Sequence, residues 1–194
     1  MRTPSRPLDH LVVAARTVDE GAAWIRARLG VEMLAGGRHA TMGTHNRVLP
    51  LGQGVYLEVI AIDPEGIVPA RPRWFGLDEP ATARLLSQGP ALLHWAERTD
   101  DLEAAARSSP DDVEIVAFER GPYRWRMALT RDGSLPGHGL RPTLIEWHSA
   151  HPTQAMADCG CNLVDRGGPR QGDARVLTPH GERTLPWRLP QGTE

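Results

Sequence analysis

One local order of secondary structure occurs twice along this chain, and each copy places a histidine on its first strand and a glutamate on its last. The first copy carries His10 and Glu58, which are 48 residues apart (58 minus 10), and the second carries His94 and Glu146, which are 52 apart (146 minus 94). These residues lie in apolar stretches of strand length. The stretches cover residues 8–15 and 55–62 in the first copy and 92–99 and 142–148 in the second.

Each copy also has a helix pattern and two further strand patterns between these end strands. In the first copy Thr17 precedes Glu20 by three residues, a capping box, and Gly30 follows the apolar helical positions as a C-cap. Asp100 and Glu103 form a similar box in the second copy. The remaining predicted elements are a helix at 102–107 and strands at 39–43, 46–51, 113–119 and 123–130. Each copy therefore reads β-α-β-β-β.

The repeat predicts a single α+β domain built from two βαβββ modules over residues 1–194. A chain of 194 residues is long enough for one domain with a real core. The predicted parts are a first module at 7–62, a proline-rich linker at 63–90 with a short helix at 81–87, a second module at 91–150, and a C-terminal extension at 151–194 with a hairpin of 174–179 and 183–187.

The two glutamates are the residues that most need a functional explanation. Side chains alternate faces along a strand, and both faces of the strand around Glu58 are largely apolar. A buried carboxylate has to be protonated, paired or metal-bound, because an unpaired buried charge is costly. Two imidazoles and two carboxylates suit zinc, manganese, iron(II), nickel or cobalt. The ordinary alternative is that the histidines are core residues and the glutamates point to solvent.

At these positions the chain resembles the vicinal-oxygen-chelate superfamily and, more narrowly, its glyoxalase-like domain proteins. Residues 8–14, 36–46, 56–60 and 71–77 carry the resemblance, which covers roughly residues 7–152. It implies an open, cupped barrel around a divalent metal, with ligands from the first and fourth strands of each module. Those ligands are His10, Glu58, His94 and Glu146. The linker at 71–77 and the tail beyond His151 depart from the glyoxalase I pattern.

Seven further residues are candidates for binding a substrate in such a cup. Three follow the first helix, two lie in the basic and aromatic cluster of the linker, and two lie on late strands of the second module; they are His39, His45, Asn46, Arg73, Trp74, Arg126 and His148. Arginine matches the geometry of a carboxylate, so an anionic substrate is expected. For each of them a structural role at a strand end or on the surface is the alternative.

The resemblance implies a metal-dependent isomerase or lyase that acts on a small oxygenated substrate, with Glu58 or Glu146 as the proton-transferring base. Two alternatives remain open at this point. One is a metal-free protein that binds or sequesters a small molecule in the same cup. The other is an iron(II) dioxygenase of the extradiol type, with two histidines and one glutamate as ligands.

Composition excludes several other classes of function. The formal net charge is -2, which suggests neither nucleic acid nor a membrane surface as a partner. All 22 basic residues are arginine, so Schiff-base chemistry and a P-loop lysine are excluded. No targeting pattern is visible, and a cytoplasmic, bacterial protein is expected. Cys159 and Cys161 are expected to be reduced thiols, and the resemblance suggests a homodimer.

Overall fold

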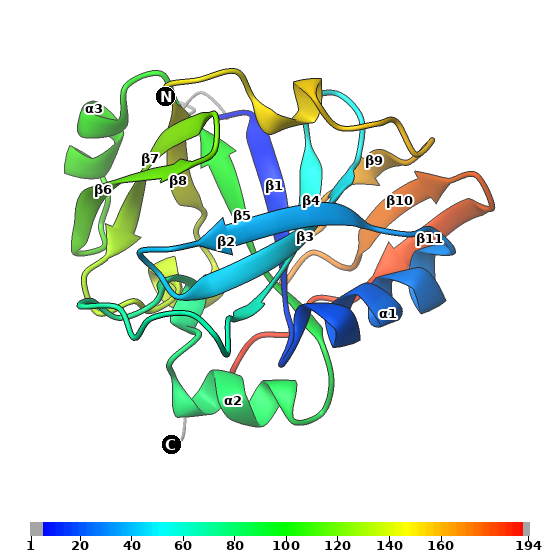
Figure 1. The fold of residues 1–194 in the computed structure, drawn as a ribbon, viewed down its shortest axis with the longest axis horizontal. Helices are drawn as coiled ribbons and strands as arrows, with labels where there is room; N and C mark the ends of the chain where they lie inside the picture. The colour runs from blue at the N-terminus through cyan, green and yellow to red at the C-terminus, as the bar shows by residue number, and fades with distance from the viewer. Residues whose placement is uncertain (1–5, 192–194) are drawn as a thin grey trace.

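Eight strands form one strongly curved sheet in the computed structural model, which describes residues 6–191 (Figure 1). The strand order is β2-β3-β4-β1-β5-β8-β7-β6. The strands are β1 (Leu8–Ala14), β2 (Leu34–His39), β3 (Thr44–Pro50), β4 (Tyr56–Ile62), β5 (Ala91–Arg98), β6 (Val113–Arg120), β7 (Tyr123–Thr130) and β8 (Thr143–Trp147). The ends of the predicted domain, residues 1–5 and 192–194, lie outside the described part of the chain.

The two predicted modules lie side by side in this sheet and meet at their first strands. β1 runs parallel to β4 and β5 runs parallel to β8, while β1 and β5 pair in antiparallel fashion at the centre. Helix α1 (Val18–Leu29) connects β1 to β2, and α3 (Leu102–Arg107) connects β5 to β6. The predicted α+β class and the cupped sheet of two βαβββ units are therefore confirmed.

Helix α1 begins and ends where the sequence indicates. The Thr17 side chain accepts a hydrogen bond from the backbone N–H of Glu20, and Gly30 ends the helix in the left-handed conformation with φ of 74°. A left-handed C-cap favours glycine because it has no Cβ to clash with the backbone. Ile25 and Leu29 are fully buried against the outer face of the sheet.

Replacing Thr17 by alanine is expected to lower the free energy of unfolding by about 1 kcal/mol, because the backbone N–H that the threonine caps loses its partner. Urea denaturation followed by circular dichroism measures the change. Thr17→Ser keeps the acceptor oxygen and is the matched control. An equal loss in both variants would show that the methyl group, and not the cap, stabilises the helix.

The second strand differs from the prediction, because it covers Leu34–His39 instead of residues 39–43. Gly36 and Gly37, which precede the predicted strand, lie inside the observed one. A Cβ on Gly36 would lie 2.0 Å from the side-chain oxygen of Asn46, so β2 can approach β3 there only with glycine. Pairing of β2 with β3 shifts register between Ala35 and Arg38, as expected for a bulge. The chain then turns through Gly43, which has φ of 57°.

The sheet separates two apolar clusters, one on its concave face and one on its convex face. Val12 and Ile60 belong to the concave cluster, together with Trp74 and Phe75 of the linker. Leu11 and Leu57 belong to the convex cluster, which α1 covers. Because side chains alternate along a strand, Glu58 shares the concave face with Ile60.

The C-terminal extension adds a small second sheet on the convex side. It has three strands in the order β11-β10-β9: β9 (Asn162–Asp165), β10 (Ala174–Thr178) and β11 (Gly181–Leu185). The hairpin of β10 and β11 is close to the prediction, whereas β9 was not predicted. Figure 1 shows β11 beside α1, and Ala174, Val176 and Leu185 pack into the convex cluster.

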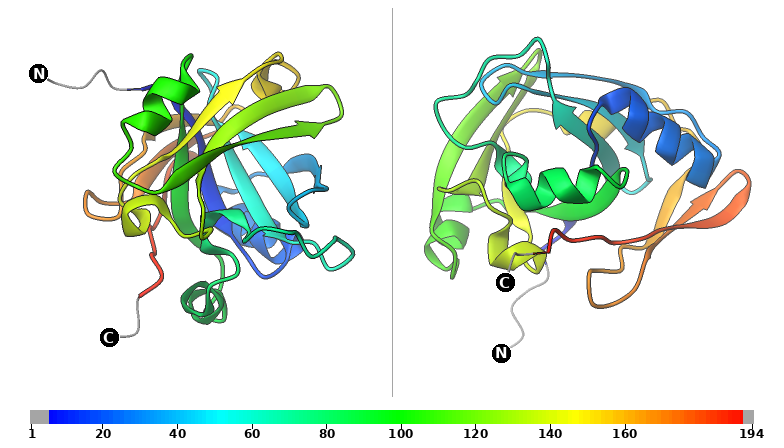
Figure 2. Two further views of the ribbon diagram at one scale, coloured as in Figure 1. Left: turned by 90° about the vertical axis from the view of Figure 1, so that its left-hand side faces the viewer. Right: turned by 90° about the horizontal axis from the view of Figure 1, so that it is seen from below.

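A further helix, α2 (Pro80–Leu86), lies at one end of the curved sheet, next to the last described residues of the chain (Figure 2). It is the short helix that the sequence predicts inside the linker. Three short 3-10 helices complete the fold: η1 (Trp74–Gly76), η2 (Pro136–Gly139) and η3 (Pro152–Gln154). Within the described chain, every helix is too short or too polar to cross a bilayer.

Candidate functional site

A cavity of about 30 Å³ lies on the concave face of the sheet, between the two modules. Five polar side chains line it, and they come from β1, β2, β3, β4 and β6. Aromatic residues and two aliphatic ones complete the wall. The polar residues are His10, His39, Asn46, Glu58 and Arg120, and the aromatic ones are Tyr56, Trp74, Phe75, Trp125 and Trp147.

Asp9 holds His10 in place from within the same strand. Neighbouring strand residues normally point to opposite faces, but the pairing of β1 with β5 shifts register between Leu8 and His10. The resulting bulge lets the Asp9 carboxylate accept a hydrogen bond from His10 Nδ1 at 2.6 Å. His10 also stacks on Tyr56, with ring centroids 4.7 Å apart. The imidazole therefore presents Nε2 to the cavity.

Asp9 is fully buried and has several partners besides His10. Its second oxygen accepts hydrogen bonds from Trp147 Nε1 at 2.9 Å and from His151 Nε2 at 3.0 Å. The Arg98 guanidinium lies 3.6 Å away. Burial alone would raise the pKa of Asp9, but the hydrogen bonds and charges of His10 and His151 hold it well below its ordinary value. Asp9 is therefore a fixed negative charge behind His10.

That negative charge changes the protonation of His10. Burial alone would lower the pKa of His10, but the hydrogen bond that its Nδ1 donates to Asp9 and the negative charges of Asp9 and Glu58 outweigh burial and raise the pKa from its ordinary value of 6.5. His10 Nε2 lies 3.7 Å from Glu58 Oε2, so the two groups face each other across the cavity without a direct hydrogen bond. In this pair the His10 imidazolium can donate a proton and the Glu58 carboxylate can accept one.

Asn46 fixes the other side of the Glu58 carboxylate. Its Nδ2 donates to Glu58 Oε1 at 2.6 Å, and its Oδ1 accepts from the backbone N–H of Gly37 at 2.8 Å. The same Oδ1 accepts from Arg120 Nη1 at 3.0 Å. Glu58 is buried, and one of its oxygens is thus occupied while the other faces His10.

Arg120 reaches the cavity from the far edge of the sheet. It ends β6, which lies close to β2 because the sheet curves until its two edges meet. Gly37 allows the approach, since a Cβ there would lie 2.8 Å from Arg120 Cδ. Arg120 Nη1 donates to His39 Nε2 at 3.2 Å, and His39 Nδ1 donates to Thr44. Burial and the positive charge of Arg120 lower the pKa of His39 to about 3, so His39 is neutral.

His94 lies on the concave face but is not one of the described residues that line the cavity. Its Nε2 accepts a hydrogen bond from the backbone N–H of Thr143 at 3.2 Å and lies 2.8 Å from the hydroxyl of the same residue. The Phe75 ring packs against it at 5.3 Å. Its Nδ1 is buried without a hydrogen-bond partner among the described residues. Burial lowers the pKa of His94 to about 3.

Glu146 lies on the opposite, convex side of its strand. Its carboxylate accepts hydrogen bonds from Arg126 and from the backbone N–H of Leu102, at the start of α3, and it lies 2.6 Å from His148 Nε2. The neighbouring Ile145 and Trp147 face the concave cluster. The prediction that Glu146 converges with His10, Glu58 and His94 therefore has to be corrected.

The register of the two modules gives the reason. Val12, two residues after His10, pairs with Glu58, whereas Ala96, two residues after His94, pairs with Thr143. Thr143 is thus the structural counterpart of Glu58. Glu146 comes three residues later (146 minus 143), and an odd step along a strand turns a side chain to the other face.

The divalent metal that the resemblance implies does not fit the four predicted ligands as they lie. Glu146 is on the far face, Thr143 stands in its place, and the third predicted donor, His94, is turned to Thr143. No group of three or more His, Cys, Asp or Glu side chains within residues 6–191 lies close enough to hold a metal ion. The second module thus contributes no carboxylate to the concave face at the position of Glu58.

The predicted substrate-binding residues divide into two groups. His39, Asn46 and Trp74 line the cavity. His45 lies on the other face of β3, next to Asn46 in the strand. Arg73 pairs with Asp78 at 2.7 Å, and Arg126 and His148 form hydrogen bonds with Glu146 on the convex side of β8. The last four do not reach the cavity, because strand alternation or an ion pair directs them away.

Two residues of the site, Asp9 and Arg120, were not predicted from the sequence. Asp9 had a signal, because it is a charged residue inside an apolar strand next to His10. Only the bulge, which the sequence does not reveal, brings its carboxylate to the imidazole. Arg120 had no signal, because its role depends on the approach of two strands at opposite ends of the sheet order.

Comparison with known proteins identifies the fold and the family. The family model described as glyoxalase-like domain matches residues 8–168. A search of curated proteins finds no matching sequence. Among solved structures, the chain is similar to methylmalonyl-CoA epimerase from Mycobacterium tuberculosis, with 21% identity, a TM-score of 0.47, and coverage of 80% of this chain and 97% of that chain. A hypothetical protein from Staphylococcus aureus has 12% identity, a TM-score of 0.52, and coverage of 95% and 87%.

Proposed function

The chain belongs to the glyoxalase-like domain family, and we propose that it is an isomerase- or lyase-type enzyme that moves a proton on a small, anionic, oxygenated substrate. The observation that carries this proposal is the buried pair of His10 Nε2 and Glu58 Oε2, 3.7 Å apart on the cavity wall. Each member is held by a buried partner, Asp9 or Asn46. An oriented acid–base pair in a cavity, with a raised pKa at its histidine, is typical of a catalytic site.

In the proposed reaction the Glu58 carboxylate removes a proton from a carbon next to a carbonyl or carboxylate group of the substrate. The electrons of the broken C–H bond move onto the carbonyl oxygen, and His10 Nε2–H donates a hydrogen bond to that oxygen. Return of the proton to carbon completes an isomerisation, and loss of a leaving group from the neighbouring carbon completes an elimination. Asp9 favours the protonated form of His10 and fixes the orientation of its ring.

Arg120 supplies the positive charge that an anionic substrate needs. It is the cation beside His39 and Asn46, and its guanidinium can bind a carboxylate in bidentate fashion. The cavity of about 30 Å³ has room for only about two waters, at 10–15 Å³ each. Substrate entry therefore requires the wall of the cavity to open, and in the proposal Arg120 exchanges its contacts with His39 and Asn46 for the substrate carboxylate.

No step of this proposal is assigned to a metal ion, because the four predicted ligands do not meet. The iron(II) dioxygenase alternative needs His94 as a third metal ligand beside His10 and Glu58. Nε2 of His94 is instead in hydrogen-bond contact with Thr143. A protein that only binds a small molecule remains the competing function. It would use the same cavity and Arg120 but would transfer no proton.

Hydrogen exchange at carbon separates the enzyme from the binding protein. The chelator-treated protein is incubated in D2O with a panel of small 2-oxo, 2-hydroxy and malonate-type acids, and proton NMR follows the loss of the signal next to the carbonyl. The proposal predicts catalysed exchange for at least one acid without added metal. Absence of exchange for every acid, or exchange that returns only with a divalent ion, contradicts it.

A further inference from the structure

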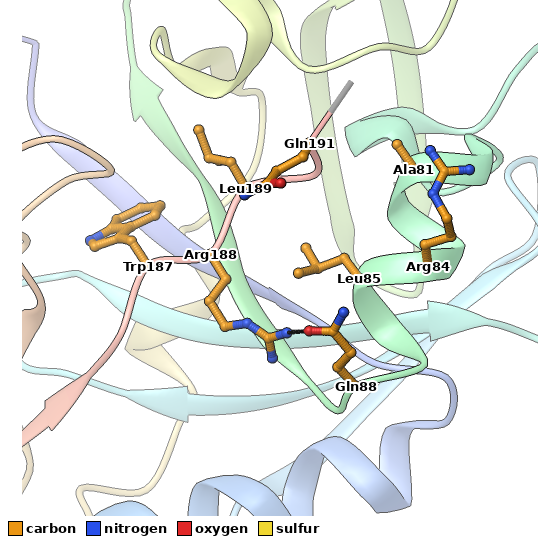
Figure 3. A pocket seen from close by; sticks show the side chains of 8 residues that line it. All are labelled: Ala81, Arg84, Leu85, Gln88, Trp187, Arg188, Leu189 and Gln191. Atoms are coloured by element: carbon orange, nitrogen blue, oxygen red, sulfur yellow. Dashed lines mark hydrogen bonds between the residues drawn. The ribbon is translucent and has the colours of Figure 1, made fainter. Parts of the chain in front are cut away.

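A groove of about 490 Å³ lies outside the cup, between α2 and the C-terminal segment 187–191 (Figure 3). One wall is formed by Arg84, Leu85 and Gln88, which project from α2 or the turn after it. The C-terminal segment forms the other wall, with Trp187, Arg188 and Leu189. The groove shares no described lining residue with the cavity around Glu58.

The groove carries two arginines and no acidic lining residue. Neither Arg84 nor Arg188 forms an ion pair with a carboxylate in the described part of the chain, although Arg73, Arg126 and Arg141 do so elsewhere. The guanidinium of Arg188 donates one hydrogen bond within the described chain, to the side-chain oxygen of Gln88 at 3.0 Å across the groove. A guanidinium has five N–H donors, so most of them remain available to a ligand.

The apolar part of the groove is anchored to the rest of the molecule. Leu85 and Leu189 pack against the concave core cluster, and Trp187 packs against the convex one. The backbone N–H of Arg188 donates to the carbonyl of Leu92 at 2.9 Å, and Trp187 Nε1 donates to the carbonyl of Arg166 at 3.1 Å. These bonds to β5 and the extension hold the tail in one position, so this wall of the groove exists before any ligand binds.

We propose that this groove is a second binding site, for a small organic anion with an apolar or aromatic body. Arg84 and Arg188 would bind the anionic group, and Trp187 with the two leucines would contact the body. The volume of about 490 Å³ lies in the usual range of ligand pockets, roughly 300–1,000 Å³. Residues 187–191 lie beyond the region that the family model matches, so the site is an addition made by the extension.

Binding of a fluorescent aromatic sulfonate, anilinonaphthalene sulfonate, tests the proposal on the full chain. We expect saturable binding with one site, accompanied by quenching of tryptophan emission. Replacing either arginine, Arg84→Gln or Arg188→Gln, should weaken the dye at least about tenfold, since each removes a charge-assisted contact. Arg107→Gln is the matched control, because Arg107 is exposed on the distant α3 and has no described ion-pair partner; this variant should bind as the wild type does.

Three further observations make the test decisive. The uncharged analogue phenylnaphthylamine should bind the wild type more weakly than the sulfonate does, and added salt should weaken the sulfonate. The proposal is overturned if the two dyes bind the wild type equally well. It is also overturned if the sulfonate binds Arg84→Gln, Arg188→Gln and Arg107→Gln with equal affinity. A change of oligomeric state in Arg188→Gln on analytical ultracentrifugation overturns it as well, because the groove would then be an interface between copies of the chain.

Discussion

Replacing Glu58 by glutamine is expected to slow the exchange of substrate hydrogen by about 10²–10⁴-fold, the usual contribution of a positioned general base. Glutamine has nearly the same shape as glutamate and keeps the oxygen that accepts from Asn46 Nδ2. It cannot take a proton from carbon. The fold and the cavity should therefore persist while the reaction is lost, and the NMR exchange assay described above measures the difference.

Glu146→Gln is the matched variant, because Glu146 has the same residue type at the repeat-related place in the sequence. It should leave the exchange rate unchanged and lower the free energy of unfolding instead, by roughly 1–3 kcal/mol, since the charge that pairs with Arg126 is removed. Equal losses of activity in the two variants would mean that both carboxylates act at one centre, against the register that places Thr143 opposite Glu58.

Removing the Asp9 carboxylate is expected to be the most destabilising change at this site. Asp9→Ala takes away the fully buried partner of His10, His151 and Trp147, and breaking a buried ion pair from one side costs about 3–5 kcal/mol. Because folding lowers the pKa of Asp9, the ionised carboxylate stabilises the folded state. This contribution is complete above the ordinary pKa of an aspartate and is lost as the pH falls. The difference in unfolding free energy between Asp9→Ala and the wild type should therefore become smaller at acidic pH.

Urea denaturation at several pH values measures this effect. Asp173→Ala is the control, because Asp173 is exposed and has no described ion-pair partner; its unfolding free energy should change by less than about 0.5 kcal/mol. A loss for Asp9→Ala that is as small as that, or one that grows as the pH falls, would show that the buried network does not hold the folded state together.

The sequence was sufficient to place one half of the site and misleading about the other. His10 and Glu58 lie together on the concave face because side chains alternate along β1 and β4. The capping residues of α1 fix where the connection between β1 and β2 begins and ends. The same reasoning placed Glu146 beside His10 and Glu58 because it compared the order of residues and not the register of strands. A shift of a single residue in pairing reverses the face of every side chain on a strand.

Other features depend on contacts that no local pattern encodes. Arg120 belongs to the site only because the curved sheet brings β6 next to β2, and Gly37 leaves room for its side chain. The strand β9 is only four residues long and mostly exposed, and it forms by pairing with β10. In these cases the arrangement of distant strands decides the role of the residue, so the structure is needed.

Metal titration of the chelator-stripped protein tests whether the site is built on the carboxylates of the first module alone. Zinc, manganese and nickel are added in turn to the wild type, His10→Ala and Glu146→Ala, and calorimetry records binding. We expect Glu146→Ala to titrate in the same way as the wild type, because Glu146 lies on the convex side of β8. One equivalent of metal bound by the wild type and lost in both His10→Ala and Glu146→Ala would contradict this expectation.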